Sequence, residues 1–444
     1  MAGVLPSSIP VLPVLHGLHR ARLGDRRSAE NVARAQSSLL GSLVRHALTS
    51  VPYYRERYAG ATTAISSAED LAALPIIDRR DLHDLGSAPF TADGFSSANT
   101  RAASTSGSSG TPVELLFSEH DLGYLRATFL WDMLASGMRP HDRVGYFRVG
   151  GFRRHRLEKL GLARNVHVNT SLGLDQQVEA FLTGRPTFLY GFPNAIVALV
   201  EELRRRRVSY DGVHDVLFAG EKLPDPARDE VLSFLGARGH EAYASVEAYT
   251  IARSCPRGAL HLRSSDVVVE VEHDDGATSV ADGEGEIVIT RLHAQAMPLL
   301  RYRLGDRVAI VPNDCSCGVR STPVVASIMG RSEDRVVTRD GRSRSADYLF
   351  SLLNPVRGVQ KTQFQQSRPG AVEVLVVPGP GAPETLERDV LAALAPTSDD
   401  FTISARLVTT IPAGANGKIQ VVKRLPTASG NASGPGRGGR VAGP

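Results

Sequence analysis

The alternation of strand and helix patterns between residues 143 and 245 most constrains the fold of this chain. Short apolar runs typical of strands lie at residues 143–149, 187–190, 213–218 and 241–245, and segments with apolar residues at helical spacing lie between them at 176–182, 194–207 and 226–236. Such alternation favours a parallel sheet, because neighbouring parallel strands need a crossover connection that is usually a helix. We therefore predict an α/β fold with helices covering a parallel sheet.

The pattern changes after residue 266, where strand-like runs follow one another with only turns between them, at residues 267–271, 285–290 and 308–311. This predicts a small antiparallel or barrel-like β subdomain. Beyond residue 330 the patterns indicate a compact α+β module, with helices at 345–353 and 383–394 and strands at 360–366, 372–377 and 401–407. We predict an N-terminal domain over residues 1–332, a C-terminal domain over 333–425 and a disordered tail over 426–444, which is rich in Gly, Pro, Ser and Ala.

Composition excludes several classes of function. Hydrophobic residues make up 42% and charged residues 22% of the 444 residues, which is typical of a globular enzyme. The formal net charge is only +4, with basic and acidic residues interspersed, so we expect no nucleic-acid partner. No run of 18 apolar residues predicts a transmembrane helix, and three cysteines argue against a disulfide framework. We expect a cytoplasmic protein with no membrane partner.

A run of small polar residues, Thr-Ser-Gly-Ser-Ser-Gly-Thr-Pro-Val, occupies residues 105–113 and precedes a strand pattern at 113–117 and a helix pattern at 119–134. A glycine-rich turn between ordered elements can present N–H groups and hydroxyls to a phosphate. It lacks the lysine of a P-loop, because Gly110 is followed by Thr111 and Pro112. On its own the run fits an anion site and a flexible surface loop equally well.

Residues 105–112 resemble the phosphate loop of adenylate-forming enzymes, the superfamily of acyl- and aryl-CoA ligases, whose pattern is [ST]-[ST]-G-[ST]-[ST]-G-x-P. Further motifs similar to those of the superfamily follow in its order: Ala-Gly-Glu at 219–221, Tyr-Ala-Ser-Val-Glu at 243–247, Arg-Tyr-Arg-Leu-Gly-Asp at 301–306, Gly-Arg-Ser-Glu-Asp at 330–334 and Pro-x4-Gly-Lys at 412–418. The segments Val-Pro-Tyr-Tyr-Arg at 51–55 and Met-Pro-Leu-Leu-Arg-Tyr at 297–302 resemble the phenylacetate-CoA ligase branch, which includes capsule-biosynthesis-type proteins.

The resemblance implies a large adenylate-forming domain, a small mobile C-terminal domain and a set of site residues. In the family, the equivalent of Asp306 accepts hydrogen bonds from the ribose, that of Glu247 helps to hold Mg²⁺, and that of Lys418 reaches the carboxylate and the α-phosphate. Arg331, in the hinge motif, is implied in catalysis and nucleotide binding. The remaining implied nucleotide-binding residues are Thr105, Ser106, Gly107, Ser108, Ser109, Gly110, Ala219, Gly220, Glu221, Tyr243, Ala244 and Ser245.

The implied activity is ATP-dependent conversion of an aryl or small acyl carboxylic acid to an acyl-adenylate, with release of pyrophosphate and transfer to coenzyme A. Two alternatives remain open: transfer to an amine, and a nucleotide-binding regulator without turnover. Thr111 and Val246, which depart from the family pattern, motivate the regulator, whereas Lys418 argues against it. A homodimer is also open. Tyr146, Phe147, Tyr190 and Phe192 fit an acyl pocket or core packing equally well.

All three cysteines belong to one candidate metal site. Cys255, His261, Cys315 and Cys317 offer three thiolates and an imidazole, a closed ligand set suited to structural Zn²⁺. The family branch has members with a zinc site of this type. The alternative is three unrelated thiols and a surface histidine. A metal here would tie the segment after Glu247 to the segment after Asp306.

Overall fold

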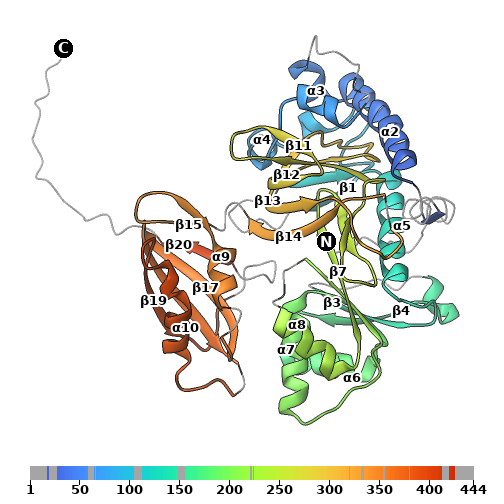
Figure 1. Cartoon of the computed structure of the whole chain (residues 1–444). Coiled ribbons are helices and arrows are strands. Elements are labelled where there is room, and N and C mark those ends of the chain that lie inside the picture. Colours follow the sequence, from blue (N-terminus) through green and yellow to red (C-terminus); the bar gives the residue numbers. More distant parts are fainter. Residues whose placement is uncertain are drawn as a thin grey trace, which may run out of the picture. The chain divides into compact units, whose positions relative to one another are not determined.

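The computed structural model describes residues 18–19, 28–58, 65, 67–104, 113–148, 156–220, 223, 225–319, 321–331, 335–353, 356–379, 381–412 and 420–425. The chain divides into two compact units (Figure 1). Of the described residues, those up to 331 belong to one unit, and those from 335 to 411 and from 420 to 425 belong to the other. Within the described residues, no helix combines the length and the apolar character that crossing a bilayer requires.

Twelve strands of the first unit form one sheet, in the order β11-β10-β12-β13-β14-β9-β8-β7-β6-β5-β3-β4. Its parallel half, as predicted from the alternation, consists of β3 (Arg143–Arg148), β4 (Arg164–Asn169), β5 (Phe188–Gly191), β6 (Asp215–Ala219) and β7 (Arg238–Ser245). The strand β4 was not predicted from the sequence. Its sequence, Arg-Asn-Val-His-Val-Asn, has only two apolar residues and therefore carries a weak strand signal.

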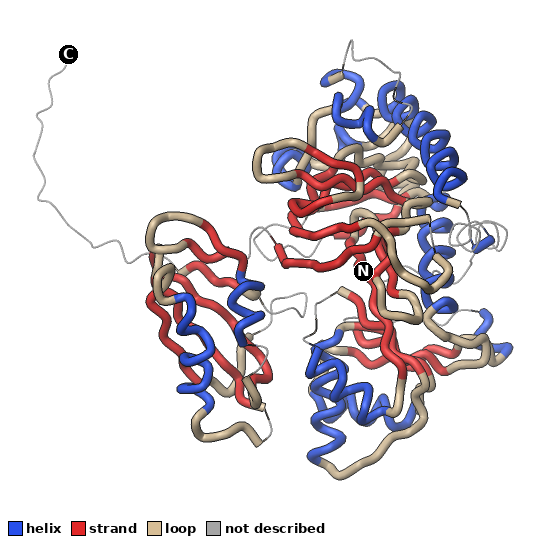
Figure 2. Tube along the Cα trace, in the orientation of Figure 1, coloured by secondary structure: helices blue, strands red, loops and turns tan. Residues whose placement is uncertain are grey.

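Helices cover both faces of this half. On one face, α6 (Leu174–Gly184), α7 (Pro193–Arg205) and α8 (Asp225–Leu235) lie together (Figures 1 and 2) and bury residues such as Phe181, Leu199 and Val231 with Phe147 of β3. On the other face, Met133 of α5 (Glu119–Ala135) packs with Tyr146 of β3. Adjacent residues of β3 face opposite sides because side chains alternate along a strand.

The antiparallel half consists of β8 (Tyr249–Ser254), β9 (Leu260–Leu262), β10 (Val267–Glu272), β11 (Thr278–Val280), β12 (Gly283–Arg291), β13 (Tyr302–Val311) and β14 (Val324–Arg331). The predicted β subdomain is thus present, and it continues the parallel half edge to edge through β8, β9 and β14, which the sequence patterns did not identify. The strand β9 has only three residues, too few for an alternation to be recognised.

The N-terminal helices pack on this antiparallel half. They are α2 (Ala29–Ser50), α3 (Pro52–Arg57), η1 (Glu69–Ala73), α4 (Arg79–Leu85) and η2 (Ala88–Phe90). One core contains Leu40 and Tyr54 from the helices and Ile287 from β12. The two-stranded sheet of β1 (Arg101–Ser104) and β2 (Glu114–Phe117) precedes α5, and η3 (Arg156–Leu160) precedes β4.

The second unit is an α+β module, as predicted. Its four-stranded sheet has the order β19-β18-β17-β20. A separate antiparallel pair, β15 and β16, precedes this sheet in the sequence. Phe364, Val374 and Val390 belong to its core. Its elements are β15 (Arg335–Val337), β16 (Ser343–Ser345), α9 (Ala346–Leu353), β17 (Val359–Arg368), β18 (Ala371–Pro378), α10 (Leu386–Leu394), η4 (Ala395–Thr397), β19 (Thr402–Leu407) and β20 (Val422–Arg424).

Candidate active site

Two of the sequence motifs meet through one hydrogen bond. Tyr243 lies in β7 and Asp306 in β13, and the Tyr243 Oη donates to Oδ2 of Asp306 over 2.7 Å. Three strands, β14, β9 and β8, separate β13 from β7 in the order of the sheet. In a flat sheet these strands would be about 19 Å apart, because neighbouring strands are spaced by about 4.8 Å. The sheet therefore bends sharply here and brings the predicted adenine-side tyrosine to the predicted ribose-binding aspartate.

Asp306 is also the cross-strand partner of Arg331 in the antiparallel pair of β13 and β14. The register shifts between Asp306 and Val308, and Gly305 has φ +84° with open space where a side chain would begin. A bulge re-aims the side chains next to it, so it contributes to the direction of the Asp306 carboxylate. The backbone of Arg331 is described and its side chain is not, so its predicted role stays a prediction.

Ala219 and Gly220 lie at the carboxyl end of β6, beside β7, where Ala219 is paired with Ala242. Ligands of open α/β sheets bind outside the carboxyl ends of the parallel strands. Gly220 has φ +87°, a left-handed conformation that favours glycine, as the chain leaves the strand. The structure thus brings the 219–220 segment next to Tyr243, as the motifs predict.

The turn after β7 holds three further predicted residues. Ser245 Oγ accepts a hydrogen bond from the Ala248 N–H over 3.0 Å, which closes the turn, and Ala244 is paired with Thr250 of β8. This bond uses an acceptor lone pair of the hydroxyl and leaves its O–H to donate elsewhere. Glu247 is in the same turn and only 9% exposed.

Thr105, Ser106, Gly107, Ser108, Ser109, Gly110, Glu221 and Lys418 lie outside the described residues, so their predicted roles remain predictions. The strands on either side of the glycine-rich run are described. Ser104 of β1 is paired with Glu114 of β2, so the run joins the ends of two antiparallel strands. The helix predicted to follow begins at Glu119 with a capping box between Ser118 and Asp121.

Three basic residues near this site were not singled out from the sequence. Arg126, Arg148 and Arg291 all act electrostatically on the phenol of Tyr249, two residues after Glu247. Burial, the largest effect, raises the pKa of Tyr249 to about 12, and the three guanidinium charges oppose that rise. The sequence offered a signal for two of these residues, because Arg148 and Arg291 each stand at the end of a strand pattern rich in apolar residues.

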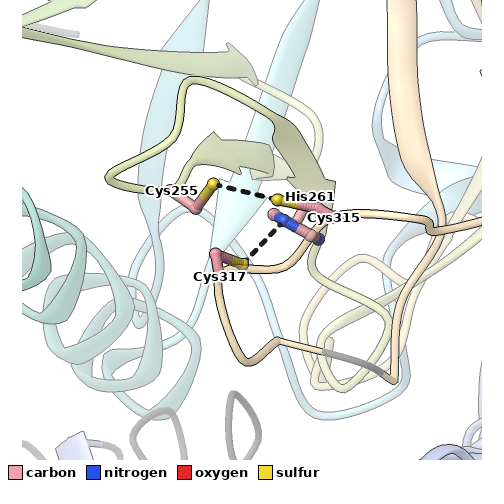
Figure 3. Close-up of side chains that lie close together, drawn as sticks. All are labelled: Cys255, His261, Cys315 and Cys317. Atoms are coloured by element: carbon pink, nitrogen blue, oxygen red, sulfur yellow. Dashed lines mark hydrogen bonds between the residues drawn. The ribbon is translucent and has the colours of Figure 1, made fainter.

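The four predicted metal ligands come together on two connections of the antiparallel half (Figure 3). Cys255 follows β8 and His261 lies in β9, whereas Cys315 and Cys317 lie between β13 and β14. The Sγ atoms of Cys255 and Cys315 are 3.7 Å apart, and Cys317 Sγ is 3.3 Å from His261 Nε2. All four ligand atoms lie within 4.8 Å of one another.

These distances fit tetrahedral coordination. With Zn–S bonds of about 2.3 Å, two sulfur ligands of a tetrahedral zinc are about 3.8 Å apart. Without a metal, burial raises the pKa of Cys317 to about 11. Hydrogen bonds lower the pKa of Cys315, the backbone N–H of Cys317 most strongly and the neighbouring thiols next. A bound metal would deprotonate the thiols outright.

Comparison with known proteins supports the predicted relationship. No family model matches the chain. Among curated proteins, it is 27% identical over 327 residues to the phenylacetate-coenzyme A ligase of Thermus thermophilus, covering 70% of this chain and 72% of the relative. It is 25% identical over 345 residues to the enzyme of the same name from Pseudomonas putida, covering 73% of this chain and 76% of the relative.

Solved structures share the fold. A 2-hydroxyisobutyryl-CoA ligase in the postadenylation state, in complex with 2-HIB-AMP, matches with a TM-score of 0.76 and 20% identity over 90% of this chain and 91% of the other. An anthranilate CoA ligase in complex with anthranoyl-AMP matches with a TM-score of 0.54 and 16% identity over 72% and 65% of the two chains. The predicted resemblance to adenylate-forming enzymes and their phenylacetate-CoA ligase branch, and the predicted fold class, are confirmed.

Proposed function

We propose that this chain, an enzyme similar to phenylacetate-CoA ligases, uses ATP to activate a carboxylic acid as an acyl-adenylate and then transfers the acyl group to coenzyme A. The observation that carries the proposal is the hydrogen bond between Tyr243 and Asp306. It joins two motifs 63 residues apart into one candidate nucleotide site at the carboxyl edge of the parallel strands.

The first step joins two anions. A carboxylate oxygen attacks the α-phosphorus, a new P–O bond forms, and the bond from that phosphorus to pyrophosphate breaks. The site must therefore neutralise charge and hold the approach in line. Asp306 would accept hydrogen bonds from the ribose hydroxyls, and Gly220 would border the adenine beside Tyr243. The run at 105–110 would hold the departing pyrophosphate through hydroxyls and N–H groups.

Mg²⁺, when bound, would neutralise the phosphate oxygens, and Glu247 is the carboxylate that we propose to hold it. Lys418 would place a positive charge between the carboxylate and the α-phosphate. In the second step the thiol of coenzyme A loses its proton and attacks the acyl carbon, and AMP leaves with the C–O bond electrons. The hinge motif at 330–334 spans the boundary between the two compact units, which is consistent with a change of domain position between the steps.

We also propose that Cys255, His261, Cys315 and Cys317 hold a structural zinc ion. The support is the closed set of four ligands and their near-tetrahedral spacing. Such an ion would connect the β8–β9 turn to the β13–β14 connection, and so hold the strand that carries Asp306 against the strand that follows the Glu247 turn.

The test is to incubate the protein with ATP, Mg²⁺ and a panel of aryl and short-chain acids, with and without coenzyme A. We expect AMP and pyrophosphate to form in step with an acyl thioester for at least one acid. The proposal fails if no acid supports AMP formation. Enzyme-dependent amide formation from a supplied primary amine, with no thioester formed from coenzyme A, would favour the amine acceptor instead.

A further inference from the structure

A group of basic side chains and one tyrosine lies beside the candidate nucleotide site, and the proposed function does not use it. Tyr249 begins β8 directly opposite Ser245 of β7. Three charges act electrostatically on its phenol: those of Arg291 at the end of β12, Arg126 from α5 and Arg148 at the carboxyl end of β3. We call these four residues the arginine cluster. Three distant parts of the chain thus bring positive charge to one place next to the Glu247 turn.

Arg291 is the most constrained member. It is 5% exposed, and its Cζ lies over the Phe117 ring, 4.9 Å from the ring centroid. The same ring meets Tyr249 edge to face, with centroids 5.9 Å apart. Phe117 is the last residue of β2, which follows the glycine-rich run. Arg291 and Tyr249 thus both contact one aromatic ring.

The Nη1 of Arg291 is buried, and within the described part of the chain no acceptor is in hydrogen-bonding reach of it. The carboxylates of Asp121 and Glu247 both act electrostatically on Arg291, and that of Asp121 is engaged elsewhere. It accepts hydrogen bonds from the backbone N–H groups of Ser118, Gln295 and Ala296 over 2.9, 2.7 and 3.1 Å. A buried guanidinium with an unsatisfied N–H is costly unless an anion completes it. The Nη1 of Arg291 is therefore a donor that an oxyanion would satisfy.

Aromatic side chains lie on and beside the strand that carries Arg148. Tyr146 precedes Arg148 by two residues on β3, and the Tyr190 ring meets Tyr146 edge to face at 5.8 Å and Phe129 at 4.9 Å. Binding sites for small molecules are lined mainly by apolar and aromatic groups, with a few polar groups that fix orientation. An aromatic wall ending in arginines therefore fits a carbon skeleton with an acidic group at its far end.

We propose that the arginine cluster binds a second acidic group, a carboxylate, on the carboxylic acid that the enzyme activates. The inference rests on the proposed function, because it assigns the substrate class of that same site. The reacting carboxylate would face the α-phosphate, and the second carboxylate would accept hydrogen bonds from Arg291 and its neighbours. A monocarboxylic acid of the same length would leave the buried Nη1 of Arg291 without an acceptor, so the enzyme should discriminate against it.

The experiment compares acids of matched length in acid-dependent ATP–pyrophosphate exchange: succinate with butyrate, and benzene-1,4-dicarboxylate with 4-methylbenzoate. For the wild-type protein we expect the diacid of at least one pair to have a kcat/KM roughly tenfold or more above its partner. A preference for the methyl-ended acid in both pairs overturns the inference. This comparison needs no variant and is therefore independent of any folding defect.

Two variants identify the source of the preference. Arg291→Gln should reduce the diacid-to-monoacid ratio to near one, Arg291→Lys should retain part of it, and the exposed-helix control Arg34→Gln should leave it unchanged. An unchanged ratio in Arg291→Gln contradicts the inference. If that variant instead raises only the KM for ATP, the anion is a nucleotide phosphate, and the second-carboxylate assignment is wrong. Exchange with monoacids alone overturns this inference only, whereas exchange with no acid overturns the proposed function too.

Discussion

At the residue scale, the phenol of Tyr243 and the carboxylate of Asp306 connect the two halves of the sheet. The hydrogen bond has a charged acceptor, and such bonds contribute roughly 1.5–3 kcal/mol. It also holds the carboxylate in the position from which it would meet the ribose. A small change at this pair should therefore affect nucleotide binding more than folding.

We predict that Tyr243→Phe raises the KM for ATP roughly tenfold, because it removes one hydrogen bond to a charged group. Steady-state kinetics with ATP as the varied substrate measures the change. Tyr210→Phe is the matched control. It removes a hydrogen bond of 2.7 Å to the Pro186 carbonyl, far from the motifs, and should leave the KM for ATP unchanged. Equal KM values for the wild type and Tyr243→Phe would contradict the assignment.

A second prediction concerns the buried Asp215 and the dependence of stability on pH. Burial alone would raise its pKa, but hydrogen bonds from Arg238, His214 and His240 together hold the pKa below its usual value. A depressed carboxyl pKa stabilises the fold above the unfolded-state pKa of about 3.9, and the benefit is lost as pH falls through the folded-state pKa. The free energy of unfolding should thus decrease below about pH 4.

The variant Asp215→Asn should lose roughly 3 kcal/mol of unfolding free energy at pH 7, because it breaks a buried charged network, and its stability should vary less below pH 4. Urea titrations across pH measure both effects. Asp175→Asn is the control, since the Asp175 side chain is 88% exposed in its pair with Arg206 and should contribute little. If the free energy of unfolding of Asp215→Asn decreased below pH 4 as steeply as that of the wild type, this role of Asp215 would be refuted.

At the scale of elements, the cysteine–histidine cluster should be a metal-dependent connection between β8–β9 and β13–β14. We predict about one zinc per chain in purified protein, as four ligands close one tetrahedral site. Cys317→Ser should lose the zinc and lower the unfolding temperature, because the metal holds the two connections together. Elemental analysis and calorimetry measure these two quantities.

The control for the zinc prediction is His83→Ala, which removes an exposed histidine on α4 and should keep the metal. Zinc-free protein with the wild-type unfolding temperature would contradict a structural metal. Because the readouts are metal content and stability, the result does not depend on knowing the substrate.

Some elements could be predicted from the sequence and others could not. The helix α7 was predicted because its buried residues Ile196, Leu199, Val200 and Leu203 recur at helical spacing, and the capping residue Ser118 marks where the predicted helix α5 begins. The strand β9 was missed because three residues carry no recognisable period. The hydrophobic periodicity of the sequence could not predict the contact between Tyr243 and Asp306. That contact depends on a bend of the sheet that involves three intervening strands.

At the scale of the whole molecule, the family motifs predicted the fold class, which is confirmed. They also supply the residues proposed for the nucleotide side of the site, because those residues lie close together in the sequence within each motif. They did not predict the arginine cluster, whose members come from α5, β3 and β12 and share no motif. The substrate side of an α/β enzyme is assembled from separate strand ends and loops, so one sequence identifies it poorly.

The central claim is adenylation, and its most direct test is acid-dependent exchange of radiolabelled pyrophosphate into ATP without coenzyme A, measured for the wild type and for Lys418→Ala. The account predicts exchange by the wild type and a loss of at least about a hundredfold in the variant, because the charge that brings the two anions together is removed. The variant should still transfer the acyl group from a supplied acyl-adenylate to coenzyme A. Exchange by Lys418→Ala at the wild-type rate, or no exchange by the wild type with any acid, would contradict the account.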